Sequence, residues 1–460
     1  MALKSLILLI VLILSPLNAF EADFLYADSD APLIAQNTLN LSLKKKLRAP
    51  QKPPRKRTTR VIKARKKFPK QPASSSSIKA QNEFQLGQEM SVLYKKKNLN
   101  NRIVSNIDFF IYKNSGSIEL KTPTDLLLNY SASAQAKIGT TNNVDVRSLY
   151  LNYSGDILNL TIGFQEIPWG ETFGFQIADI INPKDFSNPM EPERIPVFTV
   201  NSQIYINNLT IQTILTPFPR NNKLPSVDSP FNPFPETAGV NVSTKYSSMK
   251  VSLEDFEYGG KIGLLFDGGL DTSLFYLNHW NRNLLVESKI ENFQMYITPV
   301  KKKVHTLGGS FSYSLSKIVF RSDYVYHVKA PFPTEEFGDF ELTTYHESIL
   351  GVDLTLESGW IFGLQGHYNK YDDFSLSWGG MNIRKDFLNG KLKIDLMGIK
   401  GINNKDIWIK PEATWVIANF IHLKAHFDIL SGAKEQSVKK GILPFYKDMD
   451  RFFIKLTAMF

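Results

Sequence analysis

The stretch DRFFIKLTAMF, residues 450–460, ends the chain and alternates apolar with polar side chains. In an extended strand successive side chains point to opposite faces, so this alternation separates two faces. One face carries Phe452, Ile454, Leu456, Ala458 and Phe460. The other face carries Arg451, Lys455 and Thr457. An apolar face opposite a charged face is typical of a strand in a membrane barrel, so this ending predicts such a strand.

The same alternation recurs through the chain in segments of about ten residues, the length that a barrel strand needs to cross a bilayer. In residues 317–328, for example, Ile318 and Phe320 oppose Arg321 and Asp323. A helix would instead space its apolar residues three and four positions apart. We therefore predict an all-β chain, a transmembrane antiparallel β-barrel of about eighteen strands, with sixteen as the alternative count. The predicted strands are residues 84–95, 102–112, 125–138, 145–153, 157–166, 202–207, 209–215, 258–266, 270–280, 303–314, 317–328, 344–356, 360–369, 375–386, 391–400, 407–417, 420–430 and 450–460.

The connections between these strands alternate in length. Short turns fall at residues 154–156, 207–208, 267–269, 315–316, 357–359, 388–390 and 418–419. The intervening links are mostly longer and include residues 167–201, 216–257, 281–302, 329–343 and 431–449. Bacterial barrels have short periplasmic turns and longer external loops, so this alternation predicts the orientation. An even number of strands would place both termini in the periplasm.

The amino terminus has the features of an export signal. Lys4 precedes a short apolar run at residues 6–14, and Ala19 offers a small residue for cleavage. The run is too short to span a bilayer as a helix. We expect residues 1–19 to be a signal peptide, residues 20–82 a periplasmic tail and residues 83–460 the barrel. The chain contains no Cys, which excludes disulfides and thiolate metal sites.

The net charge of +10 is concentrated in the tail. Residues 44–70 contain fourteen Lys or Arg and no acidic residue, so the rest of the chain carries −4. Like charges at this density, mixed with Pro and Ser, predict disorder. After a signal peptide we expect no nucleic-acid partner. The tail is predicted to be a flexible leader or a tether to anionic envelope polymers or lipid headgroups.

One segment carries a recognisable motif: Gly163 and Gln165 on a predicted strand, then Trp169-Gly170, and then Asp179, Asn182-Pro183 and Asp185. This motif resembles that of a largely uncharacterised family of Gram-negative outer-membrane porin-like barrels, akin to alginate-export porins. Members carry a Gly-Arg-Gln strand followed by Trp-Gly and Asp-x-x-Asn-Pro-x-Asp. The matching residues here are Gly163, Gln165, Trp169, Gly170, Asp179, Asn182, Pro183 and Asp185. Phe164 replaces the Arg, which puts a charge role at that position in doubt. The chain end also resembles the terminal signal by which such barrels are recognised for insertion, with Phe460 as the signal residue and Ala458 as a departure.

The segment that follows Gln165 suits a loop folded into the mouth of the barrel, because its Gly and Asn-Pro residues permit tight turns. The candidates for the pore constriction are Gln165, Trp169, Glu171, Asp179, Asn182, Asp185 and Arg194. Charges placed near a constriction decide which ions pass, so Asp179 and Asp185 are expected to favour cations. The alternative is a structural loop whose Asp and Asn side chains bind its own backbone. The Pro-rich link at residues 217–235 is predicted to be external and variable, or to form a lid.

The polar faces of the predicted strands supply the candidates for the lumen. They are Arg321, Asp323, Glu347, Asp353, Lys393, Lys410, Glu412 and Lys424. Bases and acids balance in this set, which predicts weak charge selectivity.

Other chemistry has little support in the sequence. No pair of carboxylates has a spacing that requires acid–base catalysis, and there is no phosphate-binding loop or nucleophile elbow. His422 and His426 share a strand face but would lie about 13 Å apart, too far for a single metal. We expect no enzyme activity, no metal and no cofactor.

The predicted function is passive passage of polar solutes, or export of a polymer, through the outer membrane. The alternative is a non-transporting envelope protein whose barrel is an anchor and whose basic tail is the binding element. The expected partners are outer-membrane lipid and the barrel-assembly machinery, with anionic envelope polymers bound through the tail.

Overall fold

The computed structural model describes residues 77–93, 103–120, 126–139, 143–172, 174–223, 241–244, 252–282, 285–291, 294–334, 339–433 and 446–460, with the single residues 225, 229 and 231. The predicted signal peptide and nearly all of the predicted tail lie outside these residues, as does much of the Pro-rich link. In the described part of the chain, no helix is long and apolar enough to cross a bilayer.

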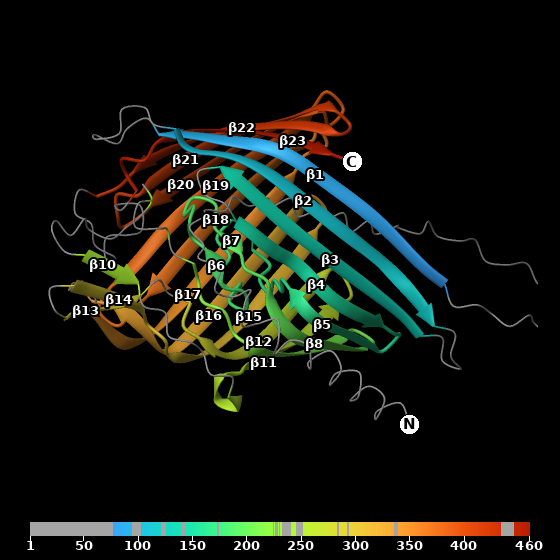
Figure 1. Ribbon diagram of the computed structural model, residues 1–460, viewed down its shortest axis with the longest axis horizontal. Helices are drawn as coiled ribbons and strands as arrows, with labels where there is room; N and C mark the ends of the chain where they lie inside the picture. Colours follow the sequence, from blue (N-terminus) through green and yellow to red (C-terminus); the bar gives the residue numbers. More distant parts are fainter. Residues whose placement is uncertain are drawn as a thin grey trace, which may run out of the picture.

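Eighteen strands form one closed antiparallel sheet, in which β1 pairs with both β2 and β23 (Figure 1). Each of the other barrel strands pairs with the barrel strands before and after it in the chain. The strands are β1 (Ser77–Leu93), β2 (Ile103–Leu120), β3 (Leu126–Gly139), β4 (Asn143–Ser154), β5 (Leu158–Gln165), β8 (Val197–Ile206), β9 (Leu209–Phe218), β11 (Glu257–Phe266), β12 (Leu270–Trp280), β15 (Lys303–Leu315), β16 (Ile318–Pro333), β17 (Phe340–Thr355), β18 (Trp360–Lys370), β19 (Ser375–Phe387), β20 (Leu392–Gly401), β21 (Ile407–Ala418), β22 (Ile421–Ser431) and β23 (Arg451–Met459). The prediction of an eighteen-stranded barrel is confirmed.

The last strand closes the barrel against the first. Leu93 lies opposite Arg451, and Gln85 lies opposite Met459. Phe84 and Phe460 exchange both backbone hydrogen bonds, with N···O distances of 3.0 and 2.8 Å. The pairing of residues 84–93 with residues 451–460 thus closes the sheet. The end of β23 lies beside the middle of β1, and residues 77–83 pair with β2 beyond that point.

The two faces of the sheet differ as the alternation predicts. Large apolar side chains are exposed on the outward face: Leu274, Leu350 and Leu364 are 71%, 69% and 60% exposed. Aromatic side chains lie outward near the short turns at Trp415 and Phe420. The inward face carries polar and charged side chains, many of them buried by material inside the barrel. Asp323 on β16, Asp428 on β22 and Lys455 on β23 are examples, at 0%, 1% and 4% exposed.

Several elements differ from the prediction. β1 begins at Ser77 and β2 continues to Leu120, because residues 77–82 pair with residues 114–119 beyond the predicted strand ends. β16 and β17 likewise extend into the predicted link at residues 329–343. The long links contain small structures with no sequence periodicity. They are β6 (Lys184–Asp185), β7 (Glu193–Arg194), β10 (Asn241–Thr244), β13 (Val286–Glu291), β14 (Gln294–Pro299) and the 3-10 turn η1 (Leu253–Asp255).

Candidate functional site

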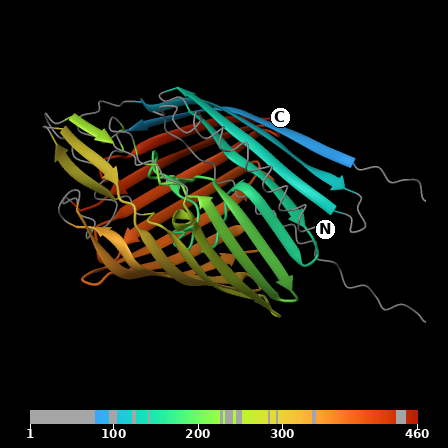
Figure 2. The same ribbon diagram turned by 60° about the horizontal axis from the view of Figure 1, so that its bottom comes forward.

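The segment between β5 and β8, residues 166–196, lies inside the barrel, and we call it the inward loop. Figure 1 labels its short strands β6 and β7 within the ring of barrel strands, and Figure 2 shows the same green segment there from another side. β6 and β7 pair with each other. Its side chains and backbone contact strands on several sides of the wall, as described below. The segment therefore crosses the lumen and is held there.

Asn182 fastens the two ends of the inward loop together. Its amide nitrogen donates to the carbonyl oxygens of Gln165 and Ile195, each at 3.0 Å, and its side-chain oxygen accepts from Ile167 N at 2.7 Å. The side chain is 1% exposed, so these contacts satisfy buried backbone groups. Gly163, just before the loop, has φ +134, and a Cβ there would lie 2.2 Å from Leu149 O. That position therefore requires glycine.

Asp323 on β16 holds the first half of the loop. Its carboxylate accepts from Glu171 N at 3.0 Å, from Thr172 N at 3.1 Å and from Thr172 Oγ1 at 2.5 Å. Gly170 passes so close that a Cβ would lie 2.8 Å from Asp323 Oδ2. A buried carboxylate with three donors is well compensated, and hydrogen bonds to a charged acceptor are the strong ones. Asp323 is therefore an anchor for the loop.

An aromatic contact adds a second attachment on the same side of the wall. The Phe175 ring lies 4.9 Å from the His367 ring on β18, and His367 stacks at 5.1 Å on Trp378 of β19. Glu347 on β17 contributes an oxygen 3.6 Å from His367 Nε2. The loop tip therefore covers a buried group of rings.

Glu191 joins the far side of the loop to three strands at the end of the barrel sheet. Lys410 on β21 contacts its carboxylate directly, while Lys424 on β22 and Arg451 on β23 each lie 3.8 Å away. Burial alone would raise the pKa of Glu191, but the positive charges of Lys410 and Lys424 hold this pKa well below its usual range. Glu191 therefore stays ionised and tethered over a wide pH range.

Glu193 makes the corresponding contact with the opposite wall. Its carboxylate oxygens lie 3.0 Å from Arg147 Nη1 on β4 and 3.6 Å from Lys137 Nζ on β3. Burial raises the pKa of Glu193, although both cations act to lower it. As the pH falls, Glu193 therefore takes up a proton earlier than an ordinary glutamate, and this tether weakens first.

Three of the predicted constriction residues, Asp179, Asp185 and Arg194, make hydrogen bonds or ion pairs within the inward loop. Asp179 binds Arg194 Nε at 2.5 Å, and Asp185 accepts from Ser187 N at 2.8 Å and pairs with Lys223 at 3.3 Å. Both carboxylates are buried, at 5% and 3% exposed. Asp185 thus binds the backbone of the loop, as the structural alternative describes, whereas Asp179 pairs with a side chain of the loop. Their role in the constriction stays a prediction.

Gln165 and Trp169 belong to a buried polar chain on the wall beside the loop. Trp169 Nε1 donates to Gln212 Oε1 at 2.9 Å, and Gln212 Nε2 donates to Asn201 Oδ1 at 2.9 Å. Gln165 Nε2 donates to the Thr199 carbonyl at 3.0 Å. Trp169 is 1% exposed, so its position is fixed by this chain.

A polar cavity of about 440 Å³ lies next to this chain, between the start of the inward loop and strands β8, β9, β11 and β12. Glu166, Glu171 and Asp271 bring carboxylates to it, of which Glu166 pairs with Arg147 at 3.1 Å. Lys261 brings an ammonium group that also donates to the Trp169 carbonyl at 3.1 Å. Burial raises the pKa of Glu171; Lys261 lowers it and Asp271 raises it further. Glu171 is thus the predicted constriction residue that borders open space.

The predicted lumen residues lie on the inward face of the barrel, and several of them form ion pairs with one another across neighbouring strands. Arg321 pairs with Asp353 across β16 and β17, and Lys410, Glu412 and Lys424 form one ion-pair group on β21 and β22. Lys393 on β20 is exposed. Arg282, two residues after the end of β12, donates to the Ile181 carbonyl of the loop at 2.9 Å. The sequence did not single out Arg282, Arg147 or Lys137 as partners of the loop. The only signal for Arg147 and Lys137 was a basic side chain on a polar strand face.

Glu191, Glu412 and His426 place ligand-type atoms within 4.8 Å of one another. Lys424 Nζ lies 2.9 Å from Glu412 and Lys410 Nζ lies 3.7 Å from it. These ammonium groups already neutralise the carboxylates, and their charge opposes a metal cation at the same place. We interpret the group as an ion-pair network that fastens the loop.

The buried pair Arg451–Asp428, with Nε to Oδ2 at 2.5 Å, gives a stability prediction. Replacing Arg451→Met leaves the buried carboxylate of Asp428 without its cation, which should lower the free energy of unfolding by about 3–5 kcal/mol. Urea titration of the protein in lipid vesicles measures this loss. The control is Lys317→Met, which breaks the exposed Lys317–Glu357 pair and should cost about 0–1 kcal/mol. Equal stability of Arg451→Met and the unmodified protein would contradict the anchoring role.

The fold is shared with solved structures at low sequence identity. OccAB1 of Acinetobacter baumannii matches with a TM-score of 0.51 and 9% identity, over 83% of this chain and 96% of that chain. OccD3 (OpdP) of Pseudomonas aeruginosa matches with a TM-score of 0.49 and 9% identity, over 83% and 91%. OmpT of Vibrio cholerae, described as an outer membrane protein and lacking loop L8, matches with a TM-score of 0.43 and 8% identity, over 83% and 99%. No family model matches the chain, and no curated protein matches it. The likeness to OccAB1 establishes the fold, and the family resemblance drawn from the Trp-Gly and Asn-Pro motif stays a prediction.

Proposed function

We propose that this chain is an outer-membrane channel for passive passage of polar solutes, and that the inward loop is its constriction. The observation that carries the proposal is a closed barrel, apolar outside and polar inside, whose lumen is crossed by one segment tethered to the wall on several sides. Only helices and closed barrels satisfy the backbone in lipid, and the outward apolar face of this barrel suits a bilayer. Short turns face the periplasm in bacterial barrels, so both termini are assigned to that side.

The lumen contains both charge signs, and most of its charges are paired with one another. Such pairing leaves little net field to select ions, which supports the weak selectivity inferred from the sequence. The cavity beside Glu171 is the exception, because Glu171 and Asp271 there face the single ammonium group of Lys261. We therefore assign a modest preference for cations to this part of the passage.

Conductance in planar bilayers is the experiment that tests the channel. Purified protein should give discrete open-channel currents in KCl that scale with the number of inserted molecules. A well-folded barrel that inserts without any conductance would favour the anchor alternative instead.

The cation preference gives a separate prediction. The double replacement Glu171→Gln with Asp271→Asn should shift the reversal potential in a KCl gradient toward anions, because it removes negative charge beside the passage. In the unmodified protein the preference should also fall with decreasing pH, at a higher pH than an ordinary glutamate would give, because burial raises the pKa of Glu171.

Asp185→Asn is the matched control for this prediction, since that carboxylate is buried and paired with Lys223. It should leave the reversal potential unchanged. A shift of the reversal potential with Asp185→Asn, and none with the double replacement, would contradict the assignment of the cation preference to Glu171 and Asp271. It would support the sequence-based expectation that Asp179 and Asp185 set this preference.

A further inference from the structure

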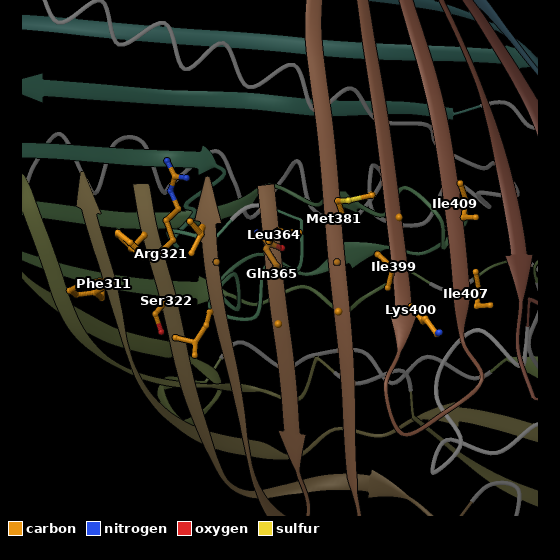
Figure 3. A pocket seen from close by; sticks show the side chains of 18 residues that line it. Phe311, Arg321, Ser322, Leu364, Gln365, Met381, Ile399, Lys400, Ile407 and Ile409 are labelled. Atoms are coloured by element: carbon orange, nitrogen blue, oxygen red, sulfur yellow. The ribbon is translucent and has the colours of Figure 1, made fainter. Parts of the chain in front are cut away.

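A groove of about 970 Å³ crosses the outward face of the barrel over strands β15 to β21 (Figure 3). Its walls are apolar side chains that are exposed on this face. Members of the wall are Phe311, Phe320, Leu350, Val352, Leu364, Met381, Ile407 and Ile409. Its volume falls within the range of about 300–1,000 Å³ that ligand clefts occupy. The groove is therefore a concave apolar site on the face that we assign to lipid.

The pairing register explains why the surface is hollow here. Directly opposed residues form one outward row across the strands: Phe311, Ser322, Leu350, Gly366, Gly379, Lys400 and Ile407. The next row is Phe320, Val352, Leu364, Met381, Gly398 and Ile409. Gly366, Gly379 and Gly398 have no atom within 4 Å of a Cβ built on them. These glycines form the floor of the groove, and the larger side chains around them form its walls. We call the space above the glycines the trough.

Lys400 provides a charge at one end of this trough. It lies directly beside Gly379 in the first row, one residue before the end of β20, and is exposed. Neither row contains an acidic residue, and in the described part of the chain no ion pair joins Lys400 to a carboxylate. An apolar trough that ends in a lysine near a strand terminus complements a molecule with apolar chains and an anionic head.

We propose that this groove binds a membrane lipid with an anionic phosphate head, with an acyl chain over Gly366, Gly379 and Gly398 and the phosphate beside Lys400. An ordinary chain of the surrounding bilayer would fill the trough without any headgroup preference. The ammonium group of Lys400 attracts a negatively charged headgroup, so the groove should prefer an anionic lipid over a neutral one. The inference rests on the placement of the barrel in a membrane, and it does not depend on solute passage through the lumen.

The test uses purified full-length protein and phosphatidylglycerol, with bound lipid counted by native mass spectrometry. Lys400→Gln should weaken phosphatidylglycerol binding about fivefold, from the contribution of a single basic residue near a lipid surface. Filling the trough with Gly379→Leu and Gly398→Leu should weaken binding about tenfold or more, because it displaces buried methylenes of the acyl chain. The open space above both glycines accommodates the added side chains.

Two controls match these variants. Lys385→Gln removes a lysine from the opposite end of β19, where its ammonium group lies over the Trp360 ring at 4.9 Å. Ala134→Leu adds apolar bulk to the outward face of β3, opposite the exposed Val146 and away from the groove. Both should retain full binding.

Equal affinity for phosphatidylglycerol and for neutral diacylglycerol would overturn the proposal, as would unchanged binding in the groove variants. A change in oligomeric state in the groove variants, without loss of lipid, would assign the groove to a second copy of the chain. Conductance of the groove variants should stay at the level of the unmodified protein, so failure of the lipid site and failure of the channel give different results.

Discussion

Replacing residues 172–189 of the inward loop with a short Gly-Ser linker is expected to raise single-channel conductance severalfold in a barrel that still assembles. The replaced segment includes Thr172, bound to Asp323, and Phe175, packed on His367. It also includes Asn188, whose side-chain oxygen accepts from Arg451 at 3.1 Å. Removing these contacts with β16, β18 and β23 clears the middle of the lumen. Planar-bilayer recordings of protein with heat-modifiable migration measure the change.

Asp323→Ala tests the same idea without shortening the chain. It removes the acceptor of the Glu171 and Thr172 hydrogen bonds, so the loop should move more and the open-channel current should become larger and noisier. Asp353→Ala is the matched control, because that lumenal carboxylate pairs with Arg321 on the wall. Unchanged conductance in both the loop replacement and Asp323→Ala would show that the inward loop does not limit the passage.

The strands could be predicted from the sequence because their residues alternate between apolar side chains that face lipid and polar side chains that face the lumen. Ile318, Phe320 and Tyr324 had to face away from Arg321 and Asp323, and the structure shows this arrangement. Strand ends were less predictable where polar residues continue the pairing, as Ser77 and Glu119 do. At the rim of a barrel, polar residues can follow one another in a strand. The apolar–polar alternation that identifies a strand is then missing, and the strand end cannot be told from a loop.

The role of each residue in the loop could be predicted only in part. The sequence predicted a loop suited to the lumen, with Asn182 and Trp169 among its residues. The assignment of ion preference to Asp179 and Asp185 stays a prediction. Their partners Arg194 and Lys223 become visible only after folding. The partner of Asp323 is the backbone of a segment about 150 positions away, and no local pattern encodes that contact.

Those distant contacts also explain how a loop with so little regular structure keeps its place. Within the described residues, its pairing strands are the two-residue elements β6 and β7. Its position depends instead on side chains of the wall: Asp323, Lys410, Arg451 and Arg147. A closed barrel is a rigid frame for such contacts, because each strand is fixed by two neighbours. The constriction can therefore be altered from the wall as well as from the loop.

Phe460→Asp is expected to reduce strongly the amount of assembled barrel in the membrane. Phe460 exchanges backbone hydrogen bonds with Phe84 at the seam, its ring lies 6.1 Å from Phe420, and its side chain is 66% exposed on the outward face. The end of the chain resembles the signal by which barrels are recognised for insertion, and the last aromatic residue is its main feature. Heat-modifiable, membrane-embedded protein in cells is the quantity to measure.

The equilibrium stability of the refolded variant separates a recognition role from a structural one. A charge near the edge of the bilayer costs about 0–1 kcal/mol, so urea titration in vesicles should show little change for Phe460→Asp. Phe420→Asp is the matched control, because Phe420 is 48% exposed and is the ring that Phe460 contacts. It places the same charge on the same rim but leaves the end of the chain intact, so assembly in cells should be nearly normal. Equal losses of assembly in the two variants would mean that rim apolarity, and not a terminal signal, is what the barrel requires at this position.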